Sequence, residues 1–387
     1  MLKELKEELE RAVALYGATE FHPRNWRGNG QIEIRGHRLT DFTSWDFFNL
    51  HSEPRVKRAV QTEVELNGVG AGASRLSSGT SALHIACELR LAQFVGQEAA
   101  VLFSSTNQAV LSLVAALISE RDCVIVDDSI QSPVVDASFL VHADVLDFRG
   151  DDPDSLLHIL DHTKPYRRKF LFLRTVGPLF GQVLNLPVLV EYASKKGVQI
   201  LLDEGYGIGL LGLRGAGSAE KFNIIRPLCI YGSLSKALGC YGAFVAAPKV
   251  LINYLINRSQ IFRSENVLPP CFAAAIEAAI EVIEVQPGTR ERLRSLARKL
   301  RRGMKEQGLA VDADLDTPII GVHFETRTTA QEFANALFAK GYLVEVITAG
   351  LMRSDQVVVR ILVNSSHKET EIDSFLAAIN AIRGRIE

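Results

Sequence analysis

The chain has 387 residues, 47% of them hydrophobic, and its 43 Lys and Arg nearly balance its 45 Asp and Glu. This length and composition can bury a large core, so we expect one large domain and a smaller one. Because neither charge sign is gathered in long blocks, no nucleic-acid or anionic-membrane surface is indicated. The five cysteines are scattered without metal-ligand spacing, which predicts no metal site, buried reduced thiols and a cytoplasmic location.

The first 50 residues are predicted to form an N-terminal helix and a hairpin arm. Residues 1–16 alternate charged and apolar residues at helical spacing and lack the apolar core of a signal peptide. Residues 31–42 alternate around a turn at Gly36, as in a hairpin. The most apolar stretch, residues 109–118, is too short to cross a bilayer and predicts a buried helix, so no transmembrane segment is expected.

Seven strand-like apolar segments follow, with helical patterns between many of them. They cover residues 99–103, 123–127, 144–148, 169–174, 199–203, 228–232 and 242–246. Strands that alternate with helices indicate an α/β fold with a mainly parallel sheet covered on both faces. In such a sheet the ligand site lies at the carboxyl ends of the strands.

From about residue 287 the pattern changes to that of a smaller α+β domain. The expected elements are a helix over 290–307, a strand over 318–324, a helix over 330–340, strands over 343–346 and 357–363, and a helix over 369–383. We therefore expect three parts: the arm (1–50), a large domain (51–286) and a small C-terminal domain (287–387).

Lys236 is the most informative residue, together with the acid that ends the strand about thirty residues upstream. Ser233 and Ser235 beside it offer hydroxyls to a phosphate, and Gly239 allows close backbone approach. In pyridoxal 5′-phosphate (PLP) enzymes a lysine forms a Schiff base with the cofactor aldehyde, and an acid holds the pyridine nitrogen protonated. Asp203 is placed to be that acid, although a strand-end Asp is otherwise often a turn former or helix cap.

A dinucleotide site is not indicated by the glycines after Asp203. Residues 207–212 match the G-x-G-x-x-G pattern formally, but they do not open a helix directly after a strand. No Walker loop, G-x-S-x-G elbow or HExxH zinc motif occurs either.

An anion site is predicted where residues 103–109 leave a strand and enter an apolar helix. Ser105, Thr106 and Asn107 would turn free N–H groups and the positive helix end toward a PLP phosphate, the alternative being a plain polar helix cap. Arg360 lies in the apolar run 357–363, where a buried guanidinium needs either an acidic partner or a ligand such as a substrate carboxylate.

The chain resembles the α-oxoamine synthases, fold type I PLP enzymes that condense an amino acid with an acyl-CoA and release carbon dioxide. The resemblance covers most of the chain. It is carried by residues 42–50, 70–80, 203–204, 211–217, 232–239 and 268–270, and by His84, Glu88, Arg360, Ser366 and His367.

The resemblance implies a fold type I transferase with a seven-stranded sheet, PLP as cofactor, and an amino acid and an acyl thioester as substrates. It also implies a homodimer with each active site at the subunit interface. The implied catalytic residues are Lys236, Asp203 and Tyr206. The implied cofactor-binding residues are Ser105, Thr106, Asn107, Gln131, Asp203, Tyr206, Ser233, Ser235, Lys236 and Asn266. The implied substrate-binding residues are Arg360, as the clamp on the amino-acid carboxylate, and Trp45.

Several family positions carry a different residue in this chain. Gln131 stands where the family has a ring-stacking histidine, and Tyr206 stands at the histidine of D-E-A-H, where a phenol can still hydrogen-bond the cofactor's ring oxygen. Asn266 replaces a threonine that reaches the neighbouring subunit's phosphate. The remaining departures are Trp45 for an asparagine, Arg174 for an active-site glutamate, Pro178 for a serine, and residues 348–355 for the P-P-T-V-P loop.

These departures leave alternatives open. Tyr206 and the lost histidine are compatible with transamination or plain decarboxylation on the same scaffold. The replaced pocket residues are compatible with a non-catalytic partner subunit. Retention of Lys236 favours an enzyme. The sequence does not specify the amino acid, the acyl chain, or whether the acyl donor is CoA or a carrier protein.

Overall fold

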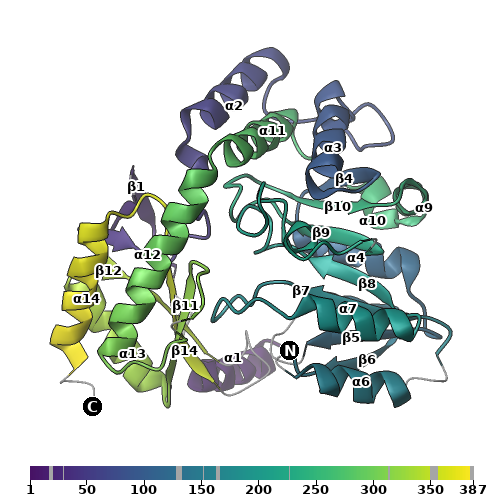
Figure 1. Ribbon diagram of the computed structural model, residues 1–387. Coiled ribbons are helices and arrows are strands. Elements are labelled where there is room, and N and C mark those ends of the chain that lie inside the picture. Colours follow the sequence, from purple (N-terminus) through teal and green to yellow (C-terminus); the bar gives the residue numbers. More distant parts are fainter. Residues whose placement is uncertain are drawn as a thin grey trace.

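A seven-stranded sheet lies at the centre of the larger part of the molecule (Figure 1). The computed structural model describes residues 1–16, 21–28, 30–127, 133–150, 152–162, 166–225, 227–312, 314–348 and 356–383. The sheet order is β4-β10-β9-β8-β7-β5-β6, and β10 is antiparallel to both of its neighbours. The strands are β4 (Ala99–Phe103), β5 (Cys123–Asp127), β6 (Asp144–Phe148), β7 (Lys169–Arg174), β8 (Gln199–Asp203), β9 (Cys229–Ser233) and β10 (Ala243–Ala247). The predicted mainly parallel seven-stranded sheet is confirmed.

Helices cover both faces of this sheet, so most of its strands are apolar along their whole length. One apolar core lies between the sheet and helices α4, α5 and α9, and the other lies under α3, α7 and α11. The predicted buried helix over the most apolar stretch is α4. The helices of this part are α2 (Pro54–Asn67), α3 (Ala82–Val95), α4 (Thr106–Leu117), α5 (Pro133–Leu140), α6 (Pro153–His162), α7 (Leu186–Lys195), α8 (Ser218–Lys221), α9 (Lys249–Arg258), α10 (Gln260–Ser264) and α11 (Pro270–Val285).

The C-terminal part packs on one side of the large sheet and contains a three-stranded sheet of order β11-β14-β13 (Figure 1). It begins with the long helix α12, which follows α11 after Gln286 and starts on Pro287, where a missing N–H is tolerated. Its elements are α12 (Pro287–Glu306), β11 (Ile319–Phe324), α13 (Arg327–Ala339), β12 (Tyr342–Leu343), β13 (Glu345–Ile347), β14 (Val357–Leu362) and α14 (Glu369–Arg383).

The N-terminal arm joins the C-terminal part through a shared sheet. After helix α1 (Leu2–Tyr16), the hairpin of β2 (Gln31–Ile34) and β3 (His37–Asp41) forms as predicted, and η1 (Leu50–Ser52) follows it. Two features were not predicted: strand β1 (Arg24–Gly28) extends the hairpin, and β12 pairs in parallel with β3. The pairing of β12 with β3 ties the arm to the C-terminal part. The proposed division of the chain into parts at residues 50 and 286 stays a prediction.

Two further predictions concern the cysteines and membrane helices. All five cysteines are buried free thiols, as predicted. Among the described residues, no helix is long and apolar enough to span a membrane, and no cluster of potential metal ligands occurs.

Candidate active site

The candidate site is a cavity of about 600 Å³ at the carboxyl ends of β7, β8 and β9, where the parallel topology predicted it. The large sheet and its loops form most of the wall, and β13 and β14 of the small sheet close it. It is lined by Trp45, Ser104, Ser105, Thr106, Asn107, Pro133, Arg174, Pro178, Leu179, Asp203, Gly205, Tyr206, Ser233, Ser235, Lys236, Tyr241, Gly242, Glu345, Ile347 and Arg360.

Lys236 projects its amine into this cavity from the turn after β9. Nζ lies 3.3 Å from the centre of the Tyr206 ring and 5.6 Å from that of Trp45, and it makes no hydrogen bond to any residue that the structure describes. Burial lowers the pKa of the amine to about 7; Asp203 opposes this shift, whereas the charge of Arg174 adds to it. Near neutral pH about half of the amine is therefore an unprotonated nucleophile.

Asp203 ends β8 and faces the same cavity. Its Oδ1 accepts the Gly205 N–H at 2.9 Å, and its Oδ2 lies 3.5 Å from Nε of Arg174, the cross-strand partner on β7. The space between the Asp203 carboxylate and the Lys236 amine is free of a side chain because residue 205 is glycine. A Cβ there would lie 3.0 Å from Asp203 Oδ1 and 3.2 Å from Lys236 Nζ, crowding both the acid and the amine.

Hydrogen-bond donors for an anion gather at another wall of the cavity. Ser105 caps α4 by accepting the Gln108 N–H at 3.2 Å, and the first-turn N–H groups of Thr106 and Asn107 have no partner inside the helix. The hydroxyls of Ser233 and Ser235 lie 2.7 Å apart at the end of β9. First-turn N–H groups and hydroxyls of this kind are typical of a phosphate site.

Arg360 of β14 has the acidic partner that the sequence left open. Nη2 contacts Glu345 Oε2 at 2.6 Å and Nη1 donates to the Pro178 carbonyl at 3.0 Å, while Nε is buried without a partner among the described residues. Glu345 stands opposite Arg360 on the neighbouring strand β13. The sequence analysis did not identify Glu345, which only the strand pairing reveals.

Trp45 and Tyr206 form an aromatic wall between Arg360 and Lys236. Their rings meet edge to face with centres 6.5 Å apart, and the Arg360 guanidinium lies 5.6 Å from the Trp45 ring. Burial raises the pKa of the Tyr206 phenol, against the opposing charges of nearby arginines, so the hydroxyl stays a hydrogen-bond donor at neutral pH.

Two predicted cofactor-binding residues are not seen in this cavity. Asn266 is exposed, forms an isolated bridge with Ser74 and does not line the cavity of its own chain, so its reach to a neighbouring subunit stays a prediction. Gln131 and residues 349–355 of the replaced loop lie outside the described residues. Lining residues that the sequence analysis missed include Tyr241, Leu179 and Ile347.

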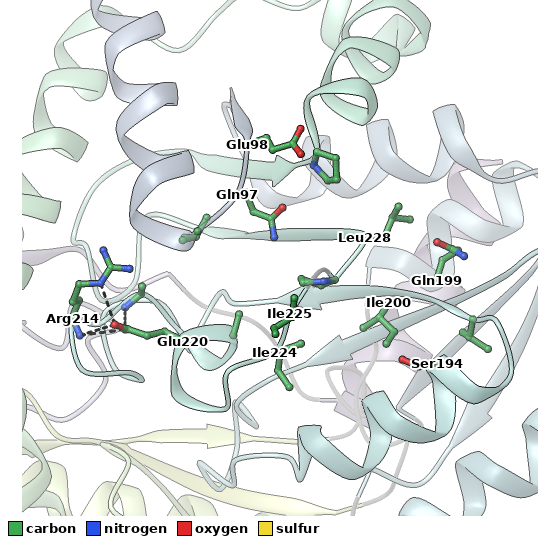
Figure 2. A pocket seen from close by; sticks show the side chains of 17 residues that line it. Gln97, Glu98, Ser194, Gln199, Ile200, Arg214, Glu220, Ile224, Ile225 and Leu228 are labelled. Carbon is green, nitrogen blue, oxygen red and sulfur yellow. Dashed lines mark hydrogen bonds and ion pairs between the residues drawn. The ribbon is translucent and has the colours of Figure 1, made fainter.

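A second cavity, of about 760 Å³, lies at the opposite ends of the strands, near the amino ends of β8 and β9 (Figure 2). Gln199 is the first residue of β8 and Leu228 directly precedes β9. Figure 2 shows Arg214 directed at Glu220, with which it forms an ion pair of 3.2 Å. It contains none of the predicted site residues. The candidate site is therefore the cavity around Lys236.

The residues of that cavity fit PLP. An amine with a lowered pKa, a carboxylate at a strand end, and donors for a phosphate line one space, and a glycine keeps the gap between acid and amine open. Lys236 would hold the aldehyde, Asp203 the ring nitrogen, and Ser105, Thr106, Asn107, Ser233 and Ser235 the phosphate.

Known proteins resemble this chain over nearly its whole length. The family model for class I and II aminotransferases matches residues 40–379. An 8-amino-7-oxononanoate synthase of Anaeromyxobacter sp. (strain K) is 32% identical over 91% of this chain and 88% of its own. The 8-amino-7-oxononanoate synthase 2 of Bacillus subtilis (strain 168) is 30% identical over 90% of this chain and 89% of its own.

Solved structures share the fold. A serine palmitoyltransferase variant from S. paucimobilis with a bound PLP–myriocin aldimine superposes with a TM-score of 0.92 at 23% identity, covering 99% of this chain and 97% of that one. An 8-amino-7-oxononanoate synthase from Francisella tularensis gives a TM-score of 0.78 at 22% identity, covering 90% and 98%. The predicted fold type I architecture and PLP dependence are confirmed. This chain belongs to the class I and II aminotransferase family and, within it, to the α-oxoamine synthases, which are PLP-dependent transferases.

Proposed function

We propose that this protein condenses an amino acid with an acyl thioester, releases carbon dioxide and forms an α-aminoketone. The observation that carries the proposal is the convergence of Lys236, Asp203 and Arg360 on one cavity from three separate parts of the chain. The relatives named 8-amino-7-oxononanoate synthase, at 30–32% identity, support it.

Each of these residues has a distinct task in the proposed reaction. When bound, PLP supplies an electron sink for negative charge at the substrate α-carbon. Lys236, with a pKa of about 7, can take up and return a proton at that carbon near neutral pH. With PLP bound, Asp203 would accept a hydrogen bond from the ring nitrogen, and the guanidinium of Arg360 would orient the α-carboxylate of the amino acid.

The test is a turnover assay with the PLP-loaded protein. Carboxyl-labelled amino acids are paired with acyl-CoAs of increasing chain length, and labelled carbon dioxide and the aminoketone are measured. We expect one pairing to release both in equal amounts, and Lys236→Ala to release neither, while Lys305→Ala, at an exposed position on α12, behaves as wild type. Failure of every pairing would reject the proposal.

Transamination is the second candidate, and Tyr206 is the observation that favours it. Its ring lies directly beneath the Lys236 amine at 3.3 Å, in the position where other family members have a histidine. A transaminase would form a 2-oxo acid from the amino acid without releasing carbon dioxide. Measuring the 2-oxo acid beside carbon dioxide in the same assay therefore separates the two reactions.

We also propose a homodimer with active sites at the subunit interface. Exposed apolar side chains gather on α2, α3 and the segments beside them, namely Leu66, Val69, Leu76, Ile85 and Leu89. Asn266 is exposed and does not line the cavity of its own chain. Mixing Lys236→Ala with an inactive Asn266→Asp variant should restore activity in the heterodimer if Asn266 serves the neighbouring site, and no recovery would count against this arrangement.

The cytoplasmic location stays part of this proposal. It is supported by the five buried free thiols, which suit a reducing compartment. Cell fractionation with an antibody against the native protein tests it.

A further inference from the structure

A third cavity, of about 460 Å³, adjoins the candidate active site next to the turn that follows Lys236. It lies between α2, α11 and residues 239–241 of that turn, and we call it the adjoining cavity. Among the described residues, Tyr241 is the one residue that lines both this cavity and the cavity around Lys236. The two spaces therefore meet at the Tyr241 side chain, which the proposed function leaves without a task.

The adjoining cavity is lined mainly by apolar side chains, and its polar groups are already paired or solvated. Lys57 and Gln61 are exposed to solvent, and Nδ1 of His51 lies 2.7 Å from Asp46 Oδ2. None of the buried polar atoms that lack a partner among the described residues belongs to this lining. The cavity thus offers contacts to an apolar chain rather than a site for a charged group. Besides Tyr241, its apolar side chains are those of Val56, Val60, Cys240, Phe272 and Ala275.

The bulk of the Tyr241 ring, rather than a polar contact, separates the two spaces. The ring packs against Phe272 with centres 5.3 Å apart, and the hydroxyl makes no hydrogen bond to any residue that the structure describes. The turn itself is held by the backbone: Cys240 N–H donates to the Leu234 carbonyl at 3.0 Å, and Leu234 N–H donates to the Gly242 carbonyl at 2.9 Å. Removing the ring should therefore open one space into the other while the turn keeps its course.

We propose that Tyr241 is a specificity-determining residue: it ends the active-site cavity toward α2 and so limits the length of the acyl group that the protein accepts. The inference rests on the proposed function, in which an acyl thioester is one of the two substrates. An acyl chain long enough to reach Tyr241 meets the ring and gains no further apolar contact. Without the ring, the same chain would continue between α2 and α11.

The experiment measures how affinity depends on the length of the acyl chain. The PLP-loaded protein is titrated calorimetrically, without amino acid, with straight-chain acyl-CoAs from butyryl- to lauroyl-CoA in steps of two methylenes. Because burial of one methylene changes a dissociation constant about four-fold, each step should tighten binding by up to about fifteen-fold until the chain reaches Tyr241. Beyond that length the wild-type affinity should stop rising, whereas in Tyr241→Ala it should rise for at least one further step.

Three variants and one control locate the effect. Tyr241→Phe keeps the ring and should keep the wild-type limit, and Tyr241→Leu should shift the limit in the same direction as Tyr241→Ala, which keeps the test valid if the alanine variant does not fold. The double variant Tyr241→Ala with Ala275→Phe fills the adjoining cavity from α11 and should restore the wild-type limit. Tyr254→Ala is the matched control, since Tyr254 on α9 is 46% exposed against 50% for Tyr241, and it should leave the limit unchanged.

Three results overturn the inference. The wild-type affinity rises without a limit up to lauroyl-CoA or does not depend on chain length; Tyr241→Ala and Tyr241→Leu keep the wild-type limit; or the double variant keeps the longer limit. Failure of the proposed function is a separate outcome, because it shows as no carbon dioxide release in the turnover assay while the length limit and its shift in Tyr241→Ala persist.

Discussion

Replacing Lys236 by Met should stabilise the apoprotein, and by more at low pH than at high pH. The pKa of the amine is about 7 in the folded protein against an ordinary value of 10.5, chiefly because burial disfavours the charged form. Between these values the unfolded chain binds more protons than the folded one, so the free energy of unfolding of the wild type rises with pH. Below about pH 7 the cost of discharging or burying the amine is present in full.

The size of the effect follows from the two pKa values. Going from about pH 6.5 to about pH 9.5, the linkage predicts that the wild type gains ~3 kcal/mol relative to Lys236→Met. This is an upper bound, since the amine faces the water of the cavity and is only half-buried. The comparison of wild type and variant cancels all groups that titrate equally in both proteins.

The assay is urea unfolding of both apoproteins at the two pH values and at equal protein concentration, because assembly would shift the midpoints. Lys305→Met, which removes an exposed lysine on α12, serves as the control and should show a small difference that does not follow this pH trend. If Lys236→Met changes the free energy of unfolding equally at both pH values, the amine is not desolvated and the reasoning is wrong.

Two further substitutions test the packing behind the site. Gly239→Ala should lower the free energy of unfolding by more than ~1 kcal/mol and reduce PLP binding. The reason is that φ is 62° at this position and that the new Cβ would lie 2.6 Å from Asp46 Oδ2. Gly288→Ala, with no atom within 4 Å, should be neutral or slightly stabilising, and equal effects of the two would contradict the argument. Arg301→Leu should destabilise by ~3 kcal/mol or more in the same assay, since its buried guanidinium donates to several backbone carbonyls that would lose their partner, whereas exposed Arg302→Leu should change little.

The large sheet was predictable because its strands are buried on both faces and so appear as short apolar runs. β5, with the sequence CVIVD, is an example, and its predicted and observed limits agree. β1 was missed because RNWRG carries no apolar alternation and lies at the edge of its sheet. Propensity at an edge strand is weak, and its pairing decides the structure.

The site shows the same division between local pattern and strand pairing. Lys236 and Asp203 could be identified because each stands in a recognisable local sequence and the family resemblance assigns their roles. The ion pair of Arg360 with Glu345 and the contact of Arg174 with Asp203 depend on which strands lie side by side. A single sequence gives no direct signal for such cross-strand neighbours, so the charge balance of the cavity required the structure.

The parallel pairing of β3 with β12 has a consequence for how the chain folds during synthesis. Thr40 and Asp41 pair with Tyr342 and Leu343, about 300 residues later in the chain. While the ribosome makes the intervening large domain, this edge of the hairpin has no strand to pair with, and an unpaired edge readily pairs with another chain. We therefore expect nascent chains that end before residue 342 to be the species most prone to aggregation and most dependent on chaperones.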